Sequence, residues 1–184
     1  MHQDFGHIFR QIRKHDRVAQ KTVFDMFSSR MLAVARTYTG NREDAEDVLT
    51  TAFLKCFSKA EDCRDEKAFP FWLRKIVINE SISHIRRNRH LLYQESENIE
   101  NIGEDILDED AADFPDFDVQ DVLSQMPLGY RLVFNLYVFE DKKHLEISQI
   151  LNISEGTSKS QLNKAKKWLQ QFFKNAENER NIKK

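Results

Sequence analysis

The chain has 184 residues, of which 40% are hydrophobic and 32% charged, and its formal net charge is −2. This length allows one domain or two small ones with real apolar cores. With only 5 Gly and 3 Pro, few tight turns are encoded, and the many charges favour helices with solvated faces. There is no signal-peptide core and no apolar run of membrane-spanning length, so we expect a cytoplasmic protein without membrane insertion.

The charge is distributed very unevenly along the chain. The stretch Gln94–Asp121 carries twelve acidic residues and no Lys or Arg, so the segments on both sides of it are basic. A nucleic acid meets the local potential of a surface and not the average over the chain. The near-neutral total therefore does not exclude nucleic-acid binding.

The residues that commonly carry catalysis form no recognisable constellation. The two cysteines, Cys56 and Cys63, make neither a disulfide framework nor a CxxC motif, and the six His are scattered. Cys56 lies on an apolar helical stripe, so we expect it in the core. Neither a nucleophile–base pair nor a phosphate loop is evident, and we expect no catalytic residue, no metal and no cofactor.

Three long helices are predicted in the first half. Residues 16–39 repeat apolar side chains at helical spacing, and Asn41 is placed to cap a second, regular helix with acidic residues in its first turn. A polar loop, Glu61–Lys67, leads to a third helix at about 69–89. This helix opens on Phe69, Phe71 and Trp72 and ends in a cluster of Arg. Trp72 could stack on bases, but a core position is favoured because large aromatic residues dominate core packing.

The last third predicts a helix-turn-helix. A short helix at 145–151, a turn at 152–154 and a longer helix from Glu155 to about Asn175 have the geometry of a DNA-reading motif. Ser154 is placed to cap the second helix. From Lys142 to Lys174 the chain has seven Lys and two Glu, a net charge of +5. By pattern alone, an ordinary helical hairpin with a solvated Lys-rich face remains an alternative.

Three segments in order resemble the extracytoplasmic-function sigma factors. The segment NREDAEDVLTTAFLKCF resembles the family's polymerase-docking helix. The segment FPFWLRKIVINESISHIRRN resembles its −10 element helix, and HLEISQILNISEGTSKSQLNKAKKWL resembles its region 4. The resemblance implies an all-α fold, with a region 2 bundle and a region 4 helix-turn-helix joined by an acidic linker. The expected bounds are region 2 at 1–92, the linker at 93–118, region 4 at 119–176 and a disordered tail at 177–184.

The resemblance also implies roles for particular residues. Those expected to bind core RNA polymerase are Asp44, Glu46, Asp47 and Leu54. Those expected at the −10 element are Arg64, Lys67, Arg74, Asn79, Ser83, Arg86 and Arg87. Those expected to read the −35 element are Glu155, Thr157, Ser158, Lys159, Gln161 and Lys164. The family usually carries Gln-Glu or Gln-Asp where this chain has Thr50-Thr51.

The function implied is that of an alternative, non-catalytic sigma factor. Its partners would be the β′ and β subunits of core RNA polymerase, promoter DNA and an inhibitory anti-sigma factor. The competing interpretation is a helix-turn-helix regulator that binds DNA without polymerase. Such a regulator would not need the acidic helix at Asp44–Phe57 or the helix that carries Asn79.

Overall fold

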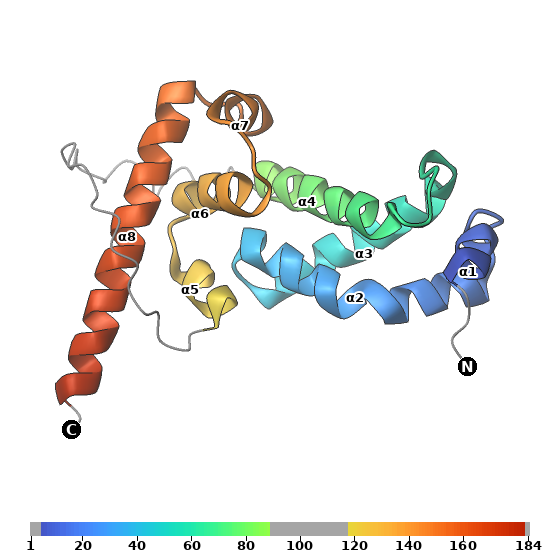
Figure 1. Cartoon of the computed structure of the whole chain (residues 1–184), viewed down its shortest axis with the longest axis horizontal. Coiled ribbons are helices and arrows are strands. Elements are labelled where there is room, and N and C mark those ends of the chain that lie inside the picture. The colour runs from blue at the N-terminus through green and yellow to red at the C-terminus, as the bar shows by residue number, and fades with distance from the viewer. Residues whose placement is uncertain (1–4, 89–117, 183–184) are drawn as a thin grey trace. The chain divides into compact units, whose positions relative to one another are not determined.

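The computed structural model describes residues 5–88 and 118–182, and the predicted acidic linker lies largely outside them. Its elements are helices, with no strand in the described ranges. The chain divides into two compact units, one built on α1–α4 and the other on α6–α8. In Figure 1, α1–α4 run from blue to green and α6–α8 from orange to red. No helix of the described residues is long and apolar enough to cross a membrane.

The first unit contains α1 (Phe5–Ile12), α2 (Arg17–Thr39), α3 (Arg42–Ser58), the short 3₁₀ turn η1 (Ala60–Asp62) and α4 (Phe69–Asn88). Sequence analysis predicts the last three of these helices to within a residue or two but does not identify α1. The predicted cap of α3 is confirmed, because the Asn41 side chain accepts a hydrogen bond from the Asp44 amide. Between α2 and α3, Gly40 has φ 83°, a left-handed conformation that glycine adopts without strain.

An aromatic cluster centred on Phe69 packs α1, α2 and α4 together. The Phe69 ring is fully buried, and its centroid lies 5.6 Å from that of Phe5, 5.8 Å from Phe9 and 5.6 Å from Phe27. These rings come from α1, α2 and α4, so burial of their large apolar surfaces fixes where α4 begins. Trp72 packs against the same core, as the sequence favours.

The second unit is built around the longest helix, α8 (Glu155–Ile182). Before it in this unit come α6 (Leu128–Phe134), the π-helical turn η3 (Asn135–Phe139) and α7 (His144–Leu151), and α5 (Val119–Gln125) precedes them along the chain. Helices α6 and α7 both pack on α8, which extends beyond them (Figure 1). The buried apolar residues of α6, η3, α7 and α8 include Leu132, Val133, Leu136, Ile147, Leu151, Leu162 and Ala165.

The turn between α7 and α8 and the end of α8 can both be compared with the bounds predicted from the sequence. The turn between α7 and α8 contains Asn152 at φ 55°, a left-handed residue that ends α7, and the predicted helix-turn-helix is therefore present. Helix α8 does not end near Asn175. It continues to Ile182, through most of the segment that the sequence predicts to be a disordered tail.

Candidate nucleic-acid and polymerase interfaces

The start of α8 is organised by two local interactions. Ser154 caps the helix, with its hydroxyl 2.9 Å from the Thr157 amide nitrogen that donates to it. Glu155 and Lys159 form an ion pair of 2.8 Å one turn apart. The hydrogen bond from Lys159 holds the pKa of Glu155 below its usual range. Lys159 therefore already has an anionic partner in the free protein, which a DNA phosphate or base would have to replace.

The exposed face of α8 differs from the predicted reading face at two positions. Ser158 is fully buried, and its hydroxyl lies 2.9 Å from Nδ1 of His144 on α7. The expectation that Ser158 faces solvent is thus wrong, because this residue joins the two helices of the motif. Its position four residues before Leu162 and seven before Ala165 puts it on the buried stripe.

Gln161 is also less accessible than predicted. It is half-buried against α6, and a Cβ atom placed on Gly129 would come within 3.0 Å of its Oε1. That oxygen is buried and has no hydrogen-bond partner among the described residues. Gln161 therefore lies close to α6, and only part of its side chain is accessible.

The remaining predicted positions of α8 are accessible. Glu155, Thr157 and Lys159 are exposed, and Lys164 is half-buried. The structure adds Ser160, which is exposed between them and which sequence reasoning missed. Because this face combines hydroxyls, Lys and a carboxylate at the N-terminal end of a helix, it offers both donors and acceptors to base edges.

A second basic surface lies along α4. Asn79, Arg86 and Arg87 are exposed, while Arg74 and Ser83 are half-buried. Sequence reasoning missed exposed Lys75, although it lies one helical turn before Asn79. The single acidic residue of α4, Glu80, is buried with Lys55 Nζ at 2.6 Å from its Oε1, so α4 presents no negative charge to solvent.

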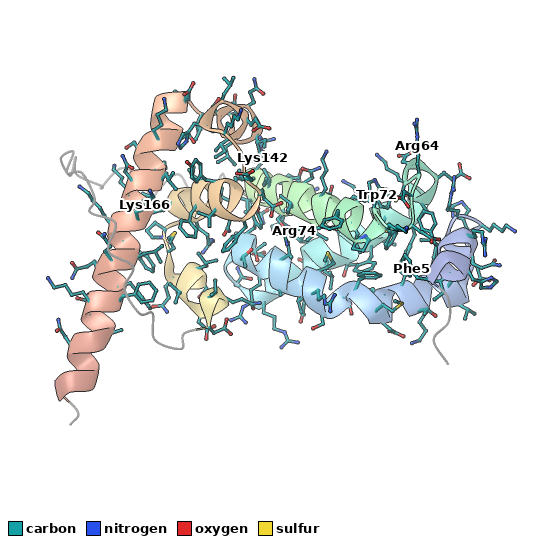
Figure 2. All side chains as sticks on the ribbon, in the orientation of Figure 1. Phe5, Arg64, Trp72, Arg74, Lys142 and Lys166 are labelled. Carbon is teal, nitrogen blue, oxygen red and sulfur yellow. The ribbon has the colours of Figure 1, made fainter. Side chains whose placement is uncertain are left out.

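The loop before α4 brings two more predicted cations to this unit. Arg64 and Lys67 are exposed, and the Asp65 side chain orders the loop by accepting from the Lys67 amide at 2.9 Å. Figure 2 shows Arg64 on this loop and Arg74 on α4. The loop cations and Arg86 therefore lie toward opposite ends of α4, whose 20 residues extend about 30 Å.

The acidic helix α3 presents a mixed surface. Glu46 and Asp47 are exposed, and Leu54 is 66% exposed although it is a large aliphatic residue. The hydroxyls of Thr50 and Thr51 donate to the carbonyls of Glu46 and Asp47 in the preceding turn. These two side chains are therefore bound to their own helix.

Asp44 has a structural role as well as its predicted one. Its Oδ2 accepts from Asn41 Nδ2 at 2.7 Å, and its Oδ1 lies 2.8 Å from Nε2 of His84 on α4. The hydrogen bond from Asn41, aided by the contact with His84, lowers the pKa of Asp44 despite partial burial. The carboxylate thus links the start of α3 to the end of α4.

The cysteines are placed where thiol chemistry is disfavoured. Cys56 is buried, as the sequence predicts, and desolvation raises its pKa to about 12. Burial also raises the pKa of Cys63. Since the thiolate is the reactive form, both residues serve packing. Among the described residues, no three His, Cys, Asp or Glu side chains are grouped to hold a metal ion.

Comparison with known proteins places both units in one family. The model "Sigma-70 region 2" matches residues 23–91, and "Sigma-70, region 4" matches residues 116–169. Together these matches cover more than half of the chain.

Individual relatives agree with these matches. RNA polymerase sigma factor SigV of Bacillus subtilis is 28% identical over 73% of this chain and 78% of its own length. ECF RNA polymerase sigma factor SigW of the same organism is 25% identical over 87% of this chain and 91% of its own. A solved structure of the sigma factor RpoE with the anti-sigma factor NepR from Bartonella quintana aligns with 84% of this chain and 96% of that one, at a TM-score of 0.49 and 21% identity. The chain belongs to the sigma-70 family, as an alternative sigma factor of the extracytoplasmic-function class that directs promoter-specific transcription.

Proposed function

We propose that this sigma factor holds promoter DNA at two separate surfaces and core RNA polymerase at a third. The −35 duplex would lie against the exposed residues at the start of α8, with Thr157, Lys159 and Ser160 in the major groove. The −10 element would lie along α4, with Asn79 reading a base and Arg86 and Arg87 neutralising phosphates.

The observation that carries this proposal is the acid-free surface of α4. A helix-turn-helix regulator needs one DNA-binding surface, and α8 supplies it. Here α4 presents a second one, with four cations and Asn79, while its only carboxylate is turned into the core toward Lys55. A second surface of this kind favours a protein that contacts two promoter elements over a regulator that acts alone.

The third surface would be the exposed side of α3. Leu54 projects from α3 one turn after Thr50 and Thr51, and an exposed aliphatic residue beside polar side chains is typical of a docking anchor with a polar rim. We expect the coiled coil of the β′ subunit to cover it, as the family resemblance implies, with the β subunit as a further partner. An anti-sigma factor would inhibit the protein by competing for these polymerase-binding faces.

In this proposal the chain is a non-catalytic subunit. The polymerase performs the chemistry of RNA synthesis, and the sigma factor contributes binding and strand opening. The protein would act in the cytoplasm, where polymerase and DNA are found.

The direct test is co-purification of the full chain with core RNA polymerase at low salt, followed by size-exclusion chromatography. We expect a stable complex that binds promoter DNA more tightly than the free chain does. If no complex forms while the free chain binds duplex DNA specifically, the regulator that acts without polymerase is the better account.

A further inference from the structure

Among the buried residues that the structure describes, Glu80 of α4 is the only one with a carboxylate. Its side chain is 8% exposed, and its Oε1 lies 2.6 Å from Nζ of Lys55 on α3. Its Oε2 is buried as well and has no hydrogen-bond partner in the same part of the chain. The surfaces proposed for DNA and for polymerase use neither Glu80 nor Lys55, so this ion pair needs an account of its own.

Stability alone explains this ion pair poorly. Taking a carboxylate out of water costs much of what its attraction to a cation returns, and apolar residues often replace a buried pair without loss of stability. The cost is increased here because Oε2 of Glu80 accepts no hydrogen bond from the described residues. A buried pair of this kind can instead fix one arrangement of the helices that it joins.

The place of Glu80 on α4 shows which arrangement would be fixed. Asn79, proposed to read a −10 base, is exposed and directly precedes buried Glu80, so the inward direction of one side chain sets the outward direction of the other. One turn later, Ser83 is followed by His84, whose Nε2 lies 2.8 Å from Oδ1 of Asp44 on α3. Twice, therefore, a residue proposed to face the −10 element is followed by one that is bound to α3.

The apolar neighbours of Glu80 cannot set this direction as sharply. Val77, Ile78 and Ile82 are buried around it, and apolar burial has no preferred angle. A hydrogen bond between charged groups is short and directional, and a group that recognises a ligand must be held to within about 0.5 Å and 10–20°. The ion pair therefore provides an angular restraint that base reading requires and that apolar packing lacks.

We propose that Glu80, held by Lys55, is a positioning residue that sets the direction in which Asn79 meets its −10 base. This inference rests on the proposed role of α4 at the −10 element and adds a determinant of its specificity. Lys55 and Glu80 themselves do not touch DNA. Their loss lowers the preference for one base and leaves polymerase binding and the preference at the −35 element as they are.

The test measures base discrimination by the holoenzyme, formed from core polymerase and the full chain. Promoter templates carry each of the four bases in turn at every position of the −10 element, and the affinity for each is measured. Asn79→Ala identifies the position that Asn79 reads, where we expect discrimination to fall about 5- to 150-fold.

Replacing the ion pair with apolar residues of similar length gives the main variant, Lys55→Met with Glu80→Met. Its melting temperature should stay within a few degrees of the parent, while discrimination at the position read by Asn79 falls at least about fivefold. In an Asn79→Ala background the same replacement should have no further effect, because the pair acts through Asn79. Glu80→Gln, which keeps an oxygen to which Lys55 can donate, should retain the discrimination.

A matched control is present on α2. Nζ of Lys21 and Oδ2 of Asp25 are also 2.6 Å apart, but both side chains are exposed and belong to one helix. Lys21→Met with Asp25→Met should therefore leave discrimination unchanged at every −10 position. An equal loss in this control would show that the effect does not depend on the link between α3 and α4, and the inference would be overturned.

Two further outcomes separate this inference from the proposed function. If the Lys55–Glu80 replacement keeps full discrimination, or weakens binding equally for all four bases at every position, the pair serves the fold alone and the positioning role is wrong, although α4 still reads the −10 element. If Asn79→Ala changes no base preference, the proposed role of α4 fails and this inference fails with it.

Discussion

At the start of α3, Asn41 and Asp44 bind each other in both directions. The side-chain Oδ1 of Asn41 accepts a hydrogen bond from the Asp44 backbone amide at 2.8 Å, and the side-chain Nδ2 of Asn41 donates to the Asp44 carboxylate. The same carboxylate contacts His84 on α4. A carboxylate with these interactions stabilises the folded unit, so its loss affects stability as well as any contact with polymerase.

Removing the Asn41 side chain should change both stability and the titration of Asp44. We expect Asn41→Ala to lower the free energy of unfolding by about 1 kcal/mol at neutral pH, as for the loss of a helix cap. The pKa of Asp44 should rise, because Asn41 is the main cause of its depression. NMR titration of the carboxyl carbon measures this shift, and an unchanged pKa would contradict the assignment.

The same pKa shift predicts a pH dependence of stability. A carboxyl group with a lowered pKa in the folded state stabilises the protein above its unfolded pKa of about 3.9. That contribution is lost as the pH falls through the folded value. Urea unfolding of the parent and Asp44→Asn should therefore differ at pH 7 and converge in acid, whereas a constant difference would show that charge is not involved.

Ser158 and Lys159 are adjacent in sequence, but we expect substitution of Ser158 to lower stability and substitution of Lys159 to weaken DNA binding. Ser158→Ala removes a buried hydrogen bond to His144 and should cost about 0.5–1.5 kcal/mol of stability without altering base preference. Lys159→Ala should leave the stability within about 0.5 kcal/mol and weaken −35 binding by an amount typical of a base contact, about 1–3 kcal/mol. Thermal unfolding and duplex binding should be measured on both variants. A loss of stability in Lys159→Ala together with a loss of −35 binding in Ser158→Ala would refute this assignment of roles.

At the scale of single helices, sequence spacing predicted α2, α3 and α4 well because each has one apolar stripe facing one core. Helix α1 was missed although Phe5, Ile8, Phe9 and Ile12 have the same spacing; its eight residues make a weak pattern when taken alone. The aromatic cluster around Phe69, which holds α1 in place, is a tertiary feature that spacing does not encode.

Helix α8 was harder to predict because two helices cover it. Ser158 faces α7 and Gln161 faces α6, so the buried side is wider than a single stripe, and polar residues occupy part of it. Placing these two residues in solvent assumed that polar side chains lie outside the core. The Ser154 cap and the left-handed Asn152, by contrast, depend on local preferences and could be expected from the sequence.

The exposed side of α3 gives a prediction at this scale. Leu54→Glu should weaken binding to core polymerase at least about tenfold, because it places a charge where an aliphatic anchor would be desolvated. The free energy of unfolding should change by less than about 0.5 kcal/mol, since Leu54 is mostly exposed. Met26 on α2, which is 50% exposed, provides the control, and Met26→Glu should keep full affinity. Equal losses in both variants would indicate a nonspecific effect of added negative charge.

At the scale of the whole molecule, the two proposed DNA-binding surfaces belong to two separate units of the chain. Region 4 carries a helix-turn-helix that a simple regulator could also possess. Region 2 adds the acid-free surface of α4 and the exposed Leu54 of α3, and both matter only if polymerase and an opened promoter are the partners. The order of the sequence motifs predicted this organisation, because each motif lies within a single helix or a helix-turn-helix.

The central claim is that this one chain reads two promoter elements when bound to core RNA polymerase. Run-off transcription with core enzyme and a randomised promoter library tests it most directly, comparing the parent with Asn79→Ala and Lys159→Ala. We predict that transcribed templates share two separated sequence boxes, and that Asn79→Ala alters the preference only in the −10 box and Lys159→Ala only in the −35 box. The absence of promoter-dependent initiation, or a change in the same box by both variants, would contradict the account.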